Sequence, residues 1–313
     1  MHPGFSVIFL TTLIGAGQGL FLGLYGAEIA AALHFVDLPP GREFFVSGVL
    51  LSLTFTGLGA VASLFHLGHP ERAWRAMAMW RTSWLSREGI ALLSFMLAVF
   101  LYGLGHLLEW RATLAIGAVA AVLCLSLFVC TGMIYACIKF LQEWASPLTV
   151  INYVVLGCAS GFTLGSAFAA FTSDRLAIAY SAAAIAFTLL GLCTRAASLV
   201  RNSRIKRKST LQSATGIHHP RIVQKSQGFM GGSYNTREFF HGRSKKFLRS
   251  VKWIFLVLAF ALPLVLLGFS LQHVSAIVLC LAFLVQYAGL IAERWFFFAQ
   301  SNHPQNLYYQ AIS

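Results

Sequence analysis

Eight long apolar stretches divide this chain and decide what it can fold into. A helix needs roughly 20 mainly apolar residues to cross about 30 Å of hydrocarbon. The stretches that meet this length are residues 5–35, 44–67, 89–108, 113–140, 148–172, 176–200, 253–271 and 275–299. Only 11% of the residues are charged, against about 25% in a typical soluble domain. The sequence therefore predicts a polytopic membrane protein.

The apolar stretches are expected to be helices. Lipid offers no partners for backbone N–H and C=O groups, and the strict alternation of a barrel strand is absent. No charged residue occurs from Trp253 to Ala292, a run too long for one span, so we expect a tight turn at Gln272 and His273 near its middle. The predicted fold is all-α: a bundle of eight transmembrane helices that forms one membrane domain over residues 1–313.

Small residues recur in the first and fifth predicted spans. Several of these glycines are spaced four residues apart: Gly15, Gly19 and Gly23 in one span, and Gly157, Gly161 and Gly165 in the other. Such spacing lets transmembrane helices approach each other closely. We therefore expect packing grooves along both helices.

The basic residues predict the orientation. The 23 Lys and Arg outnumber the 10 Asp and Glu, which gives a net charge of +13. Eight spans put both termini on one side, together with loops 69–88, 141–147 and 201–249. Only Arg42, Arg111 and Arg175 fall on the other side, which leaves 20 basic residues on the first. By the positive-inside rule, both termini are predicted to be cytoplasmic, and the first helix to be retained in a bacterial inner membrane.

Common catalytic motifs are missing from the sequence. The six cysteines lie within apolar spans and form no C-x-x-C pair, so neither a zinc site nor a cluster-binding spacing is indicated. There is no Walker A loop, dinucleotide-binding glycine motif or hydrolytic triad spacing. The basic excess belongs to membrane loops and does not indicate nucleic acid. Any metal centres of a redox function would belong mostly to a partner protein.

Ionisable residues near the predicted outer surface are candidates for function. Glu28 lies about two turns inside the outer end of the first helix. Its carboxyl group is a candidate either for a proton route or for a structural ion pair. His34, His106 and His273 share one depth. A membrane haem b needs two axial histidines that face each other, whereas each of these three lies at a helix end, where interfacial capping is the simpler interpretation.

The predicted inner ends of the second and third spans carry the strongest candidate site. His66 ends one helix and Glu88 begins the next, so an antiparallel hairpin brings both to the same membrane level. Imidazole and carboxylate groups exchange protons near neutral pH, as a quinone site requires. Arg72 and Arg87 are candidates for balancing charge on quinone oxygens. The alternative is an interfacial belt of arginines and tryptophans, with His66 as a helix cap.

The loop 201–249 is the only long polar segment. Its first residues are basic, as in an anchor on anionic lipid. Its later part combines glycines with aromatic residues, which favours docking of a partner protein; a disordered loop is the alternative. The candidate docking residues are Phe229, Tyr234, Arg237, Phe239, Phe240 and His241.

These features resemble the DmsC-type membrane anchors of molybdopterin iron–sulfur oxidoreductases. The resemblance rests on the eight spans, on the stretch from His66 to Ala73 with Leu-Ser-Arg-Glu at 85–88, and on the loop 209–242. It implies that one partner subunit holds molybdopterin, that another carries iron–sulfur clusters, and that the anchor exchanges electrons with ubiquinone or menaquinone, typically without haem. It also implies that His66 and Glu88 are the functional pair, with Ser86 in the same motif.

The predicted orientation narrows the resemblance. The dimethyl sulfoxide reductase anchor docks its partners on the outer face, whereas the motif-bearing face here is predicted to be cytoplasmic. This is similar to SoeC-type anchors of cytoplasmic sulfite-oxidising enzymes, as is the loop 209–242. The resemblance therefore implies a subunit, non-catalytic by itself, of a sulfite:quinone oxidoreductase. The alternatives are a reductase anchor that oxidises quinol and, from another class, a secondary transporter.

Overall fold

The computed structural model describes residues 1–35, 40–206, 208–223, 225, 239–304 and 306. Within these residues the chain forms helices and no strand. Eight helical segments are long and apolar enough to cross a membrane, which confirms the predicted all-α bundle. They are α1 (Phe5–Ala32), α2 (Arg42–Leu64), α3 (Trp84–Leu107), α4 (Thr113–Ala136), α5 (Pro147–Ala169), α6 (Asp174–Ser203), the segment Lys245–Ser270, and α10 (Ala276–Ala299).

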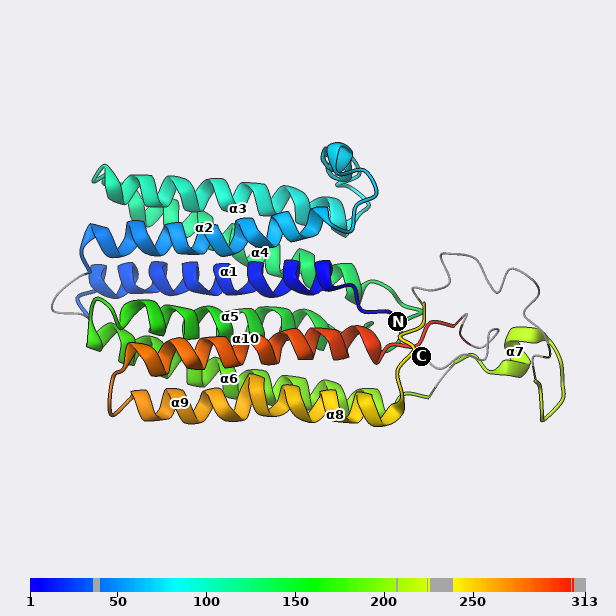
Figure 1. The fold of residues 1–313 in the computed structure, drawn as a ribbon. Helices are drawn as coiled ribbons and strands as arrows, with labels where there is room; N and C mark the ends of the chain where they lie inside the picture. Colours follow the sequence, from blue (N-terminus) through cyan, green and yellow to red (C-terminus); the bar gives the residue numbers. More distant parts are fainter. Residues whose placement is uncertain (36–39, 207, 224, 226–238, 305, 307–313) are drawn as a thin grey trace.

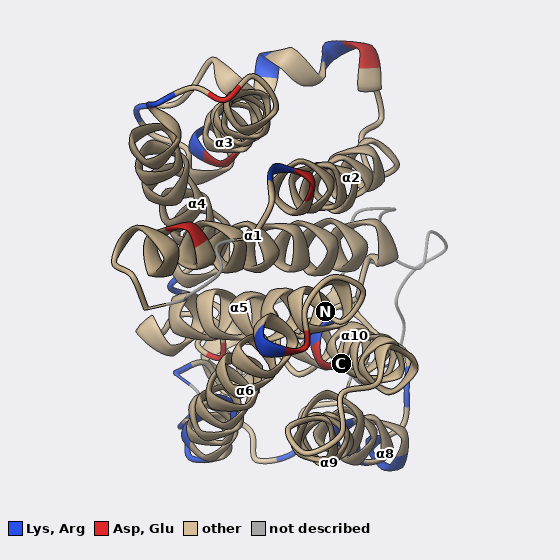
Figure 2. Ribbon diagram, turned by 90° about the vertical axis from the view of Figure 1, so that its left-hand side faces the viewer, with Lys and Arg blue, Asp and Glu red and all other residues tan. Residues whose placement is uncertain are grey.

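Helices α1 and α5 lie at the centre of the bundle (Figures 1 and 2). Helices α2, α3 and α4 lie on one side of this pair, and α6, α8, α9 and α10 on the other. In the most apolar window of both α1 and α5, 72% of the residues are buried, against 28–39% in the other spans. The outer helices therefore present most of the lipid-facing surface.

The seam between α1 and α5 depends on the glycines that the sequence singled out. Gly19 of α1 lies directly against the backbone of Gly157 and Gly161 of α5, and a Cβ on either helix at this point would collide with the other backbone. Gly17 faces Ser52 and Thr56 of α2 in the same way. The expected packing grooves are confirmed, and α1 uses two of its faces for them.

The segment Lys245–Ser270 is one span with an irregular centre. It consists of α8 (Lys245–Leu256), a π-helical turn η3 (Val257–Ala261) and α9 (Leu262–Ser270). Pro263 lies just after the π turn. Proline has no backbone N–H to donate, so a regular α-helical hydrogen bond is missing at this point of the span. Gln286 of α10 donates to the Thr188 hydroxyl (3.0 Å) and to the Ala259 carbonyl (3.4 Å), which uses an acceptor within the π turn. The predicted turn at Gln272 and His273 is present before α10.

The N-terminus and the C-terminal end of α10 lie at one end of the bundle (Figure 1), together with the loop 65–83 and the short helix α7 (Leu211–Thr215). We call this end the termini face. The loop 65–83 contains the 3₁₀ helix η1 (Pro70–Met77). Helix α3 begins at Trp84, five residues before the predicted start of the third span, because the Ser83 hydroxyl caps it by accepting from the Ser86 N–H. Glu88 therefore lies inside the helix.

The glycine seam predicts a position-specific effect of one methyl group. We expect Gly161→Ala to destabilise the protein by about 1–3 kcal/mol, since the new Cβ meets the immovable backbone of Gly19 and Leu20. Gly165→Ala on the same helix is the control, because its Cβ finds an ordinary 3.5 Å contact with Leu20. Thermal unfolding of the two purified variants in detergent measures the difference. Equal melting temperatures would contradict the close contact.

Candidate functional site

Glu88 is a buried carboxyl group near the termini face. It lies four residues after the start of α3, or about 6 Å along the helix, and is 7% exposed. The Thr131 hydroxyl of α4 donates to its Oε1 at 2.6 Å. Glu88 and Thr131 line a cavity with Thr11 and Gln18 of α1 and Tyr153 of α5. We call it the Glu88 cavity; its free space of about 10 Å³ is roughly enough for one water.

Ser86 and Arg87 fasten the loop 65–83 to the start of α3. The Ser86 hydroxyl donates to the Ala76 carbonyl. Arg87 donates to the carbonyls of Trp80 (2.9 Å) and Arg81 (2.7 Å), and its guanidinium lies 4.4 Å from the centre of the Trp84 ring. Both side chains therefore have local structural partners.

His66 lies two residues beyond the end of α2, on the same face of the bundle as Glu88. More than a third of its surface is exposed, and it is not among the residues that line the Glu88 cavity. Neighbouring residues nevertheless remove enough water to lower the pKa of its imidazole. Lowering the pKa favours the neutral ring at neutral pH, which can accept a proton.

The rest of the loop 65–83 carries the features of an interfacial segment. The Trp74, Met79 and Trp80 side chains are exposed. Arg75 and Arg81 lie over the neighbouring tryptophan rings at 5.7 and 5.4 Å. Arg72 is exposed and pairs with Glu71 at 3.6 Å. This arrangement suits the headgroup region of a membrane, as the interfacial-belt interpretation of the sequence expects.

A buried charge cluster that the sequence reasoning missed lies between α6 and α10. The Arg195 Nε lies 2.7 Å from one oxygen of Glu293, and an Arg294 Nη lies 3.1 Å from the other. Arg195 is 2% exposed and Glu293 is fully buried. The Arg294 guanidinium also lies 3.8 Å from the centre of the Tyr153 ring. Charges so deep in a membrane protein usually mark a functional route or a buried network.

The sequence did contain the signal for this cluster. Arg195, Glu293 and Arg294 lie inside predicted apolar spans, but the orientation argument counted both arginines among the 20 residues of the termini face. The structure places them inside helices, about 12 Å and 8 Å from the helix ends. The termini face therefore has 18 basic residues and not 20. These are the residues that remain of the 23 Lys and Arg after the three arginines of the other side and the two buried arginines are subtracted. The charge asymmetry persists.

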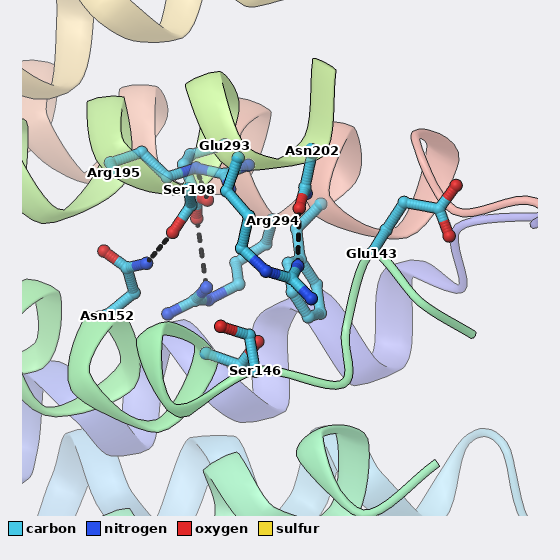
Figure 3. A pocket seen from close by; sticks show the side chains of 11 residues that line it. Glu143, Ser146, Asn152, Arg195, Ser198, Asn202, Glu293 and Arg294 are labelled. Atoms are coloured by element: carbon cyan, nitrogen blue, oxygen red, sulfur yellow. Dashed lines mark hydrogen bonds and ion pairs between the residues drawn. The ribbon is translucent and has the colours of Figure 1, made fainter. Parts of the chain in front are cut away.

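The Arg195–Glu293–Arg294 cluster borders a second polar cavity, which we call the arginine cavity. Asn152 of α5 and Ser198 of α6 line it, and the Asn152 amide donates to the Ser198 hydroxyl at 2.8 Å. Figure 3 shows these side chains gathered around the cavity, with Glu143 at the right on the loop that precedes α5. Its free space is again about 10 Å³, enough for about one water.

Glu28 lies beside His106 near the opposite end of the bundle. Its Oε1 lies 3.5 Å from the Nε2 of His106, and both side chains are nearly buried. The His106 ring stacks on Phe45 at 4.1 Å and contacts Tyr102 edge-on at 4.7 Å. This geometry favours the structural pair over the proton route for Glu28.

The three candidate haem ligands have separate surroundings. His34 is exposed beyond α1 with a positive φ of 58°, and His273 is exposed beside Phe269. In the described part of the chain, no hydrogen bond, ion pair or ring contact joins them to each other or to His106. Over the same residues, no group of three or more His, Cys, Asp or Glu side chains could hold a metal ion. All six cysteines are free thiols.

The candidate docking residues fall into two groups. Phe229, Tyr234 and Arg237 lie outside the described residues. Phe239 stacks on the His303 ring at 3.9 Å, next to the C-terminal end of α10. Phe240 is half-buried, and His241 is buried and accepts from the Arg243 N–H through its Nδ1. The end of the loop thus folds against the chain itself.

Comparison with known proteins supplies the family. Residues 1–309 match the family described as DMSO reductase anchor subunit (DmsC). The chain is also 50% identical to a subunit of the sulfite dehydrogenase of Allochromatium vinosum, over the whole of both chains. The chain belongs to the DMSO reductase anchor subunit family.

Membership confirms several expectations from the sequence. A DmsC anchor is the membrane subunit of a molybdoenzyme complex, so the molybdopterin and iron–sulfur centres belong to partner subunits. The eight apolar helices agree with a multi-pass membrane protein. The anchor interpretation thereby displaces that of a secondary transporter.

The buried charge cluster gives a second testable prediction. We expect Glu293→Gln to destabilise the protein by about 3–5 kcal/mol, because Arg195 and Arg294 would remain buried without a counter-charge. Glu109→Gln is the matched control, since Glu109 pairs with Arg42 on the exposed outer face, where such pairs contribute about 0–1 kcal/mol. The yield and melting temperature of each variant give the comparison. A Glu293→Gln protein as stable as the control would contradict the need for a counter-charge at Glu293.

Proposed function

We propose that this chain is the membrane subunit of a sulfite:quinone oxidoreductase. The observation that carries the proposal is the full-length 50% identity to a sulfite dehydrogenase subunit. In the proposed reaction, sulfite and water give sulfate, two protons and two electrons in a molybdopterin partner. The electrons pass through an iron–sulfur partner to ubiquinone or menaquinone, which takes up two protons and becomes quinol.

The proposed complex sits on the cytoplasmic side of a bacterial inner membrane. The support is the charge distribution, with 18 basic residues assigned to the termini face and three to the other. The termini face also carries the loop 65–83 and the described parts of the segment 201–249, which we propose as the docking surface for the iron–sulfur and molybdopterin subunits. Phe239 stacks on His303, and His241 is buried within the chain. We therefore propose that these two residues stabilise the conformation of the docking surface and do not contact the partner directly.

The proposed quinone site lies where α2, α3 and the loop 65–83 meet at the termini face. The Glu88 cavity has room for about one water molecule and is too small for a quinone ring. We therefore propose that the ring binds outside it, with Glu88 behind the ring and His66 at its edge, each able to deliver a proton. The hydrogen bonds of Arg87 and Ser86 hold the loop that borders this site. Arg72 is the first arginine of this loop and is exposed, so we propose that it balances charge on the quinone oxygens.

The reverse direction of electron flow is the second candidate. The family description names dimethyl sulfoxide reductase, in which the anchor would oxidise quinol. The same site would then receive protons instead of donating them. The sulfite dehydrogenase relative favours reduction of quinone.

Two substitutions test the proposed site in the assembled complex. We expect Glu88→Gln and His66→Ala each to slow sulfite-dependent quinone reduction at least tenfold, since removal of a general acid typically costs about 10²–10⁴ in rate. Sulfite oxidation by ferricyanide should continue, because that acceptor bypasses the membrane subunit. Absorbance assays on membranes follow both reactions.

The control is Glu71→Gln, which removes an exposed carboxylate from the same loop. It should reduce quinone at the wild-type rate. If His66→Ala and Glu88→Gln behave like this control, the site assignment is wrong, while ferricyanide-coupled sulfite oxidation would still establish the complex.

Reporter fusions test the orientation. We expect green fluorescent protein at the C-terminus to fluoresce and alkaline phosphatase at the same place to be inactive. A phosphatase fusion that replaces the chain after Arg111, in the link between α3 and α4, should be active because this link lies on the other face. The opposite pattern would place the partners outside the cytoplasm and favour the reductase.

A further inference from the structure

Polar cavities in the termini-face half of the bundle follow one another in a row. Between the arginine cavity and the Glu88 cavity lies a third, which we call the middle cavity; its walls include Thr11 and Thr12 of α1 and Ser160 of α5. It too has about 10 Å³ of free space, room for about one water. Each cavity is lined by groups that can hydrogen-bond such a water.

Shared side chains join these cavities. Arg294 lines both the arginine cavity and the middle cavity. Tyr153 and Thr11 line both the middle cavity and the Glu88 cavity. These shared side chains connect the buried ion cluster, through the middle cavity, to the cavity that Glu88 lines.

The row reaches the aqueous phase through Arg201. This residue lines the arginine cavity and also an open hollow at the termini face, with Lys139 and Gln142. Its guanidinium donates to the carbonyls of Gln142 and Ala145, which fixes it at the boundary between the two. Water in the hollow is therefore one side chain away from the first buried cavity.

The buried groups along the row call for water. The Arg195 Nη2 lies buried without a hydrogen-bond partner in the described structure, although such donors are nearly always satisfied. A water in the arginine cavity would accept from it. Glu293, Tyr153 and Thr11 line the successive cavities. Carboxylates, hydroxyls and waters are the groups from which intramembrane proton routes are built.

We propose that this row of cavities is the proton route between the termini-face aqueous phase and Glu88. The proposal rests on the proposed function, in which each quinone that receives two electrons from the iron–sulfur partner also takes up two protons. A proton enters at Arg201, passes the Arg195–Glu293–Arg294 cluster, and reaches Glu88 by way of Tyr153 and Thr11. Glu88 thus receives a proton from the side of the cavities, while the quinone lies on its other side.

Thr11→Val and Tyr153→Phe test the route in the complete complex. Both remove a hydroxyl group and little volume. We expect each to slow sulfite-dependent quinone reduction at least fivefold, to leave ferricyanide reduction unchanged, and to raise the solvent deuterium isotope effect. Addition of a small permeant weak acid such as azide should restore at least half of the rate, because it carries protons to Glu88 by another way.

Matched controls separate loss of a proton route from loss of packing. Thr163→Val removes a buried α5 hydroxyl, and Tyr180→Phe one that donates to the Gly23 carbonyl; neither residue lines the row. Both should keep the wild-type rate and isotope effect. Melting temperatures of all four variants show whether each is folded, and Thr11→Val alone decides if Tyr153→Phe does not assemble.

The outcomes distinguish this proposal from the proposed function. If Glu88→Gln slows quinone reduction but Thr11→Val and Tyr153→Phe do not, the quinone site stands and the route is wrong. If these variants are slow without rescue by azide and without a larger isotope effect, their role is structural and the route is also wrong. If Glu88→Gln has no effect, the proposed site itself fails. Rescue of both hydroxyl variants supports the route.

Discussion

The close contact of α1 with α5 determines the rest of the architecture. Lipid tails give helices no hydrophobic reason to associate, so close packing and buried polar contacts have to hold the bundle together. Glycines let the two backbones touch at Gly19 and Gly161, and the remaining helices then divide into two groups around this pair (Figure 2). The Glu88 cavity and the middle cavity lie beside the seam, because Thr11 of α1 and Tyr153 of α5 line both of them.

Much of the fold could be predicted from the sequence because lipid imposes a single rule on every span. A stretch of 20 apolar residues has to be helical, and eight such stretches are visible in the amino-acid sequence. Helix ends were less predictable, since they depend on individual caps. The hydroxyl of Ser83 begins α3 five residues earlier than hydropathy suggested, and this shift moves Glu88 from a helix start to the bundle interior.

The candidate site was harder to predict, because sequence places residues by depth but not by direction. His66 and Glu88 do lie at the same end of the bundle, as the hairpin argument required. Glu88 nevertheless points towards α1, α4 and α5, where Thr131 binds it, while His66 stays at the surface. Arg195 and Glu293 lie on different helices and are 98 residues apart in sequence. Only the packing of these helices reveals that the two opposite charges lie 2.7 Å apart.

The position of the buried cluster has a consequence for energy conservation under the proposed function. Removing Arg195, Glu293 and Arg294 from water is expensive, and a well-packed apolar core would often be at least as stable. All three lie in the half of the bundle next to the termini face, which we propose is also where electrons enter. If protons and electrons reach the quinone from the same side, no net charge crosses the membrane during the reaction. The chain would then act as an electroneutral entry point that fills the quinol pool, and any proton-motive gain would arise in the enzymes that oxidise that quinol.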